Sequence, residues 1–181
     1  MAESRYRGTR RELYEVGEER RGRPRRNRVK IFLKMDGAVH RRLLSLRERF
    51  PLLKASQSEL VGLGVDLVGQ RTAEMAVALG RDEGVLPAGV VDLEALYLFW
   101  NLEIGSQLGA RATTVYLSPE QAVRLSEIRA RLRLQIHVSQ SALLNLGVTL
   151  LTDLARSVTD GAEGAPIRNI AEMSVTLKPF A

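Results

Sequence analysis

The sequence predicts a mainly α-helical fold of two units, each a short β-strand followed by two helices, joined by an extra helical segment. Three observations lead to this prediction. A twelve-residue segment occurs twice, as SQSELVGLGVDL over 56–67 and as SQSALLNLGVTL over 139–150, with eight identical positions. The two copies begin 83 residues apart, and such a repeat indicates a duplicated structural unit. Upstream of each copy, the hydrophobic residues change from alternation to helical spacing.

Each unit is expected to begin with a β-strand, because hydrophobic and other residues alternate over 29–35 and over 112–118. One row of each strand would face a core. The opposite row consists of Lys30, Phe32 and Lys34 in the first strand and of Ala112, Thr114 and Tyr116 in the second.

Two helices are expected after each strand. In the first unit, Asp36 can cap the first helix, and a capping box at Ser56 marks the start of the second. Ser118 and Ser139 stand at the corresponding positions of the second unit. Gly64 lies inside the second helix, where glycine is costly, so we expect another backbone to approach closely there.

The composition is that of a globular chain with unevenly distributed charge. The 181 residues carry a formal net charge of +6, and 45% of them are hydrophobic. Residues 1–34 hold twelve arginines and lysines against five glutamates, so the whole positive excess is N-terminal. The absence of cysteine excludes disulfides and thiolate catalysis. No segment resembles a signal peptide or a membrane span, so a cytoplasmic protein is expected, with no membrane partner.

Residues 1–27 are expected to form a flexible basic arm, because they are too poor in hydrophobic residues to fold alone. Concentrated positive charge beside a folded domain most often meets nucleic acid phosphate. A solubilising tail or a membrane-surface role is the alternative. The candidate phosphate ligands are Arg23, Arg25, Arg26 and Arg28.

The chain is therefore divided into the arm, a first unit over 28–70, a helical connector over 71–110, a second unit over 111–157 and a loosely ordered C-terminal tail over 158–181. In the connector, Asp92 can cap a hydrophobic helix that contains Leu96, Tyr97 and Trp100 and extends to Ile104. These side chains would be buried between the units, or would serve self-association or a protein partner. The tail ends in SVTLKPF, which suggests an edge strand or a partner peptide.

The segments Lys30 to Asp36 and Thr113 to Ser118, with the helices after them, resemble the ribbon-helix-helix DNA-binding family, the MetJ/Arc class of regulators. The resemblance covers residues 28–70 and 111–156. It implies that two strands pair as an antiparallel ribbon, within one chain or between two, and that this ribbon enters the major groove of double-stranded DNA.

The resemblance also implies the site residues. Base contacts would come from Lys30, Phe32, Lys34, Thr114 and Tyr116. Ala112 departs from the family pattern, which favours the first strand as the stronger reader. Phosphates would bind at the starts of the second helices, at Lys54, Ser56, Gln57 and Ser58 and at His137, Ser139, Gln140 and Ser141. Serine at a helix start also stabilises the helix by itself, so a purely structural role stays open.

We therefore expect a sequence-specific DNA-binding protein of the nucleoid, used as a transcriptional repressor or antitoxin-like regulator. The alternatives are a plasmid partition or conjugative relaxosome accessory protein, and a non-enzymatic adaptor that docks another protein through residues 91–104. No enzymatic activity, cofactor or metal is expected. His40 and His137 are the only histidines, and the sequence has no glycine-rich phosphate loop or metal-binding motif.

Overall fold

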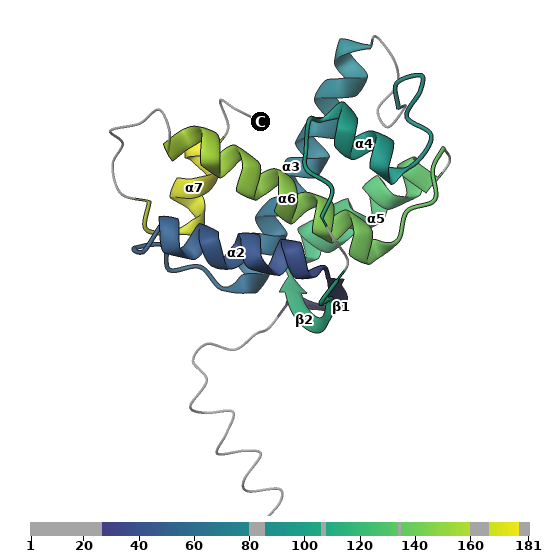
Figure 1. Cartoon of the computed structure of the whole chain (residues 1–181). Helices are drawn as coiled ribbons and strands as arrows, with labels where there is room; N and C mark the ends of the chain where they lie inside the picture. The colour runs from purple at the N-terminus through teal and green to yellow at the C-terminus, as the bar shows by residue number, and fades with distance from the viewer. Residues whose placement is uncertain (1–26, 80–85, 106–107, 134, 160–166, 178–181) are drawn as a thin grey trace, which may run out of the picture.

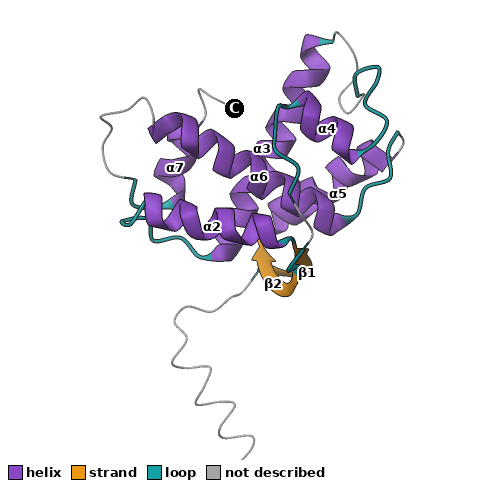
Figure 2. Cartoon of the chain, in the orientation of Figure 1, coloured by secondary structure: helices purple, strands orange, loops and turns teal. Residues whose placement is uncertain are grey.

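The structure, a computed structural model, describes residues 27–79, 86–105, 108–133, 135–159 and 167–177. The described part is mainly helical, with one small antiparallel sheet, as the sequence predicts (Figures 1 and 2). The elements are β1 (Val29–Met35), α2 (Gly37–Arg49), α3 (Gln57–Ala78), α4 (Leu93–Phe99), β2 (Arg111–Leu117), α5 (Pro119–Arg133), α6 (Gln140–Thr159) and α7 (Ile170–Leu177). The order strand, helix, helix therefore occurs twice.

The two strands pair with each other inside one chain. β1 and β2 are antiparallel, with Val29 opposite Leu117, Phe32 opposite Thr114 and Met35 opposite Arg111. Of the two pairings that the sequence left open, this is the one within the chain. Alternation gives the ribbon one buried face, with Ile31, Leu33, Met35, Val115 and Leu117 all in the core.

Helices α3 and α6 cross at the centre of the molecule, and each contributes more residues to the core than any other described element. At the crossing, Gly64 and Gly147 occupy equivalent positions of the repeat. A Cβ atom built on Gly64 would lie 2.6 Å from the carbonyl carbon of Gly147. The close backbone approach expected from Gly64 is confirmed, and its partner is the second copy of the same residue.

The two units are interlocked rather than side by side. β1 packs on α6, which belongs to the second unit, and β2 packs on α3, which belongs to the first. A single hydrophobic core extends through both units. Neither unit can therefore bury its strand without the other.

The connector places a short helix on this core. Asp92 caps α4 as predicted, because its carboxylate accepts a 2.7 Å hydrogen bond from the amide of Ala95. The helix ends at Phe99, so the expected stripe does not reach Ile104, which is 48% exposed. Leu96, Tyr97 and Trp100 are 0%, 7% and 7% exposed. They are used inside the chain and are not available as a surface for a partner.

The C-terminal stretch differs from the expectation of a loosely ordered tail or an edge strand. Residues 170–177 form helix α7, in which Met173 and Leu177 are buried at 0% and 1% exposure against α3 and α6. Asn169 caps this helix by accepting a 2.9 Å hydrogen bond from the amide of Glu172. None of the described helices combines the length and the hydrophobicity that a membrane crossing requires.

Candidate nucleic-acid interface

The outward face of the ribbon carries the side chains that alternation predicts. Lys30, Phe32 and Lys34 are exposed on β1, and Thr114 and Tyr116 are half-buried on β2. Phe32 stands out because 73% of this large hydrophobic side chain is exposed, at the centre of the strand. The structure thus brings all five predicted base-reading residues onto one face.

Lys30 and Phe32 are in contact on this face. The ammonium nitrogen of Lys30 lies 5.0 Å from the centroid of the Phe32 ring, a cation–π contact. Such a contact stabilises an exposed pair by about 0.5–1 kcal/mol. The lysine therefore leans toward Phe32, at the centre of the strand.

The start of α3 is a closed capping box. The Ser56 hydroxyl accepts a 3.3 Å hydrogen bond from the amide of Glu59, and the Glu59 carboxylate accepts a 2.8 Å bond from the amide of Ser56. This hydrogen bond from the backbone of Ser56 lowers the pKa of Glu59, with the Arg28 guanidinium, 4.0 Å from the carboxylate, as a smaller cause. The capping box is confirmed, and it places a carboxylate beside the predicted phosphate site.

The start of α6 has the same cap without the carboxylate. The Ser139 hydroxyl accepts a 3.1 Å hydrogen bond from the amide of Ala142, which stands where the first copy has Glu59. The first turn of α6 holds no acidic residue. Its free amide groups and the positive end of the helix dipole are therefore less compensated than those of α3.

Ser58 and Ser141 connect the helix starts to the ribbon. The Ser58 hydroxyl accepts a 3.0 Å hydrogen bond from the amide of Tyr116, and the Ser141 hydroxyl accepts a 3.1 Å bond from the amide of Lys34. Each second helix thus holds the strand of the other unit at a predicted base-reading position. Both hydroxyl groups have this structural role, and a serine hydroxyl that accepts one bond can still donate another to phosphate.

The remaining predicted phosphate ligands lie near these starts. Lys54 and His137 are exposed in the segments before α3 and α6, while Gln57 and Gln140 are half-buried in the first turns. The amide of Lys54 donates a 2.8 Å hydrogen bond to the carbonyl of Arg168, so the segment before α7 fixes this loop. Arg28 is exposed at the start of β1, whereas Arg23, Arg25 and Arg26 lie outside the described residues.

Sequence reasoning missed Asn145, which positions one end of the ribbon. Its side-chain amide donates a 3.1 Å hydrogen bond to the carbonyl of Lys34, and its carbonyl accepts a 3.3 Å bond from the amide of Asp36. Asp36 precedes α2 as predicted but makes no side-chain capping bond. The sequence did contain a signal, because Asn145 lies between two leucines of a hydrophobic helix. A polar side chain that is buried there normally has a hydrogen-bond partner.

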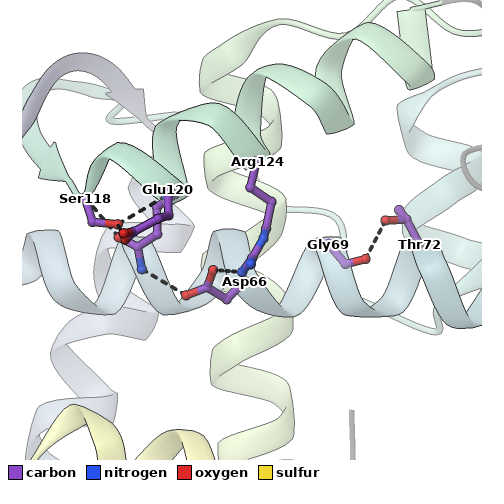
Figure 3. A network of polar contacts seen from close by, with 7 residues as sticks. Asp66, Gly69, Thr72, Ser118, Glu120 and Arg124 are labelled. Atoms are coloured by element: carbon purple, nitrogen blue, oxygen red, sulfur yellow. Dashed lines mark hydrogen bonds and ion pairs between the residues drawn. The ribbon is translucent and has the colours of Figure 1, made fainter.

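A polar network behind the ribbon joins α5 to α3 (Figure 3). Gln121 caps α5 together with Ser118 and donates a 2.9 Å hydrogen bond to Asp66, whose other carboxylate oxygen pairs with Arg124. Gly62 leaves space for the Gln121 side chain, because a Cβ on Gly62 would lie 2.5 Å from the side-chain oxygen of Gln121. The network holds the helix after β2 in place.

Among the described residues, no group of three or more histidine, aspartate or glutamate side chains could hold a metal ion. The chain matches no protein-family model, no curated protein and no solved structure. A functional conclusion therefore rests on the ribbon face and the helix starts.

Proposed function

We propose that this chain is a sequence-specific double-stranded DNA-binding protein of the ribbon-helix-helix type, with both units in one chain. The observation that carries the proposal is the exposed row Lys30, Phe32 and Lys34 on a two-stranded ribbon whose other face is buried. A two-stranded ribbon fits the major groove, which is about 12 Å wide. There lysine donates to guanine, and phenylalanine or threonine contacts the methyl group of thymine.

The helix starts support this geometry. Ser58 and Ser141 tie the starts of α3 and α6 to the ribbon, so the amides near Ser56 and Ser139 lie beside the reading face. Backbone amides at a helix start bind phosphate and fix the register of a protein on the duplex. In this proposal, the ribbon reads base pairs while the two helix starts hold the DNA backbone.

The proposed biological role is regulation of transcription at the nucleoid, as a repressor or an antitoxin-like regulator. A role in plasmid partition, or as an accessory protein of conjugation, is the second candidate. An adaptor function is favoured by a different observation. Leu98 and Phe99 of α4 are 68% and 52% exposed, whereas the opposite face of the helix is buried. This pair is the exposed hydrophobic surface of α4 that a protein partner would cover.

A gel-shift experiment with the double variant Lys30→Ala and Lys34→Ala tests the base-reading role. We expect specific affinity to fall while affinity for unrelated DNA changes less, because each lysine–guanine contact contributes about 1–3 kcal/mol of discrimination. The matched control, Arg131→Ala with Arg133→Ala, removes the same charge from the last turn of α5, about 20 Å along the helix from the ribbon. Equal losses of specific affinity in both variants would reject the ribbon as the reader.

The basic arm is proposed to add affinity through phosphate contacts. Removal of residues 1–27 should then weaken binding to every DNA sequence alike. The slope of log affinity against log salt concentration should become shallower by about 0.9 for each lost phosphate contact. An unchanged slope would show that the arm does not touch the DNA backbone.

A further inference from the structure

The ribbon has a two-fold symmetric backbone with an asymmetric set of side chains. Asp36 and Ser118 precede the first helix of each unit, so each β1 position corresponds to the β2 position 82 residues later. Phe32 therefore corresponds to Thr114, and the register pairs these two residues with each other. A pseudo-two-fold axis passes through this pair and exchanges the two ends of the ribbon.

The side chains at the two ends are different. At one end, Lys30 stands opposite Tyr116, and at the other end, Lys34 stands opposite Ala112. The axis exchanges Lys30 with Ala112 and Lys34 with Tyr116, so neither end reproduces the other. Because both lysines belong to β1, each end receives one lysine, but only the Lys30 end has a second large polar side chain. We call these the tyrosine end and the alanine end.

The helix starts beside these ends differ as well. The α3 start meets the tyrosine end through Ser58, and it carries the Glu59 carboxylate with Arg28 beside it. The α6 start meets the alanine end through Ser141, and Ala142 replaces the glutamate. The arm joins the chain next to Arg28, at the tyrosine end. Phosphate contacts should therefore also be unequal on the two sides of the axis.

From this register we infer that the chain binds a non-palindromic DNA site in a single orientation, an inference that rests on the proposed DNA-binding function. A symmetric dimer presents the same side chains to both half-sites and selects a palindrome. Here the alanine end offers one lysine to its half-site. The tyrosine end offers a lysine held over Phe32 and a phenol hydroxyl that can donate or accept.

Selection from random duplexes with the full-length chain tests the inference. We expect an enriched motif that differs from its own reverse complement. Replacing one half-site with an inverted copy of the other should weaken binding about ten-fold or more, since each wrong base pair has a substantial cost. A palindromic motif would overturn the inference and leave DNA binding intact. The absence of any enriched motif would reject the proposed function itself, and the inference with it.

A symmetrised variant provides the matched comparison. The changes Ala112→Lys, Thr114→Phe and Tyr116→Lys give β2 the outward row of β1, and all three positions are exposed or half-buried. The motif selected by this variant should become palindromic in its central base pairs. A motif that stays identical to that of the wild-type chain would show that these side chains do not set the asymmetry.

The orientation can also be mapped without altering the ribbon. The chain has no cysteine, so Leu52→Cys, at a 53% exposed position in the turn before α3, accepts a DNA-cleaving iron chelate at one defined place. On the selected site, strand cleavage should occur on one side of the motif only. Equal cleavage on both sides would mean that the chain binds in two orientations, and would overturn the inference.

Discussion

Gly64 of α3 and Gly147 of α6 face each other so closely that a Cβ on either would lie 2.6 or 2.7 Å from the backbone of the other. Real side chains do not tolerate this distance, so any larger residue must push the helices apart. The two helices contribute many of the core residues, and they carry Ser58 and Ser141, which contact the two strands. Their separation would therefore disturb both the core and the positions of the two strands.

Alanine at either glycine should destabilise the protein strongly. We expect Gly64→Ala or Gly147→Ala to lower the free energy of unfolding by about 1–3 kcal/mol or more, although alanine favours a helix by about 1 kcal/mol. Urea denaturation measures the change. The control is Gly69→Ala, also in α3, where the new Cβ would lie 3.0 Å from the flexible Arg124 side chain and 3.5 Å from Ile128, with no backbone close by. Equal stability of Gly64→Ala and Gly69→Ala would refute the backbone contact.

Asn145 should matter more than an ordinary buried polar residue. Asn145→Ala leaves the carbonyl of Lys34 and the amide of Asp36 without their partner, so we expect a loss of about 1–3 kcal/mol in unfolding free energy. Thr152→Val is the control, because this buried hydroxyl bonds only to carbonyls of its own helix. If both variants unfold at the same urea concentration, Asn145 does not hold the end of the ribbon.

Features set by neighbouring residues could be predicted from the sequence. The alternation around Phe32 gave the correct exposed face of the strand, and the spacing at Ser56 gave the capping box, because both depend on a few adjacent positions. The cost of glycine inside a helix predicted the close approach at Gly64, and the structure shows that its partner is Gly147, the equivalent residue of the second copy.

Features that depend on packing between distant segments could not be predicted from the sequence. The segment SVTLKPF suggested an edge strand because it contains the β-branched Val175 and Thr176, yet its first four residues end helix α7, in which α3 and α6 bury Met173 and Leu177. The pairing of Lys30 with Tyr116 depends on the register of strands far apart in the sequence. The difference between the two ends of the candidate site was therefore hidden until the register was known.

The stability of the protein should depend on Tyr97 at high pH. Burial raises the pKa of Tyr97 to about 12, against the opposing effect of its hydrogen bond to Thr149. An unfolded tyrosine ionises near pH 10, so the contribution of Tyr97 is complete below that pH and is lost as the pH rises through about 12. Tyr97→Phe should therefore show a stability deficit at about pH 8 that shrinks by about 1 kcal/mol at about pH 11. A deficit that is the same at both pH values would argue against the raised pKa.

The fold should not require a second chain, because β2 supplies the partner edge of β1 and Leu33 and Val115 are buried inside one molecule. The urea midpoint should therefore be the same at about 1 µM and about 100 µM protein, whereas the midpoint of an obligate dimer rises with concentration. A urea midpoint that rises with protein concentration would contradict pairing within the chain. The exception is a rise that disappears in the double variant Leu98→Ser with Phe99→Ser. In that case the exposed face of α4 joins folded chains, and the ribbon still forms within each of them.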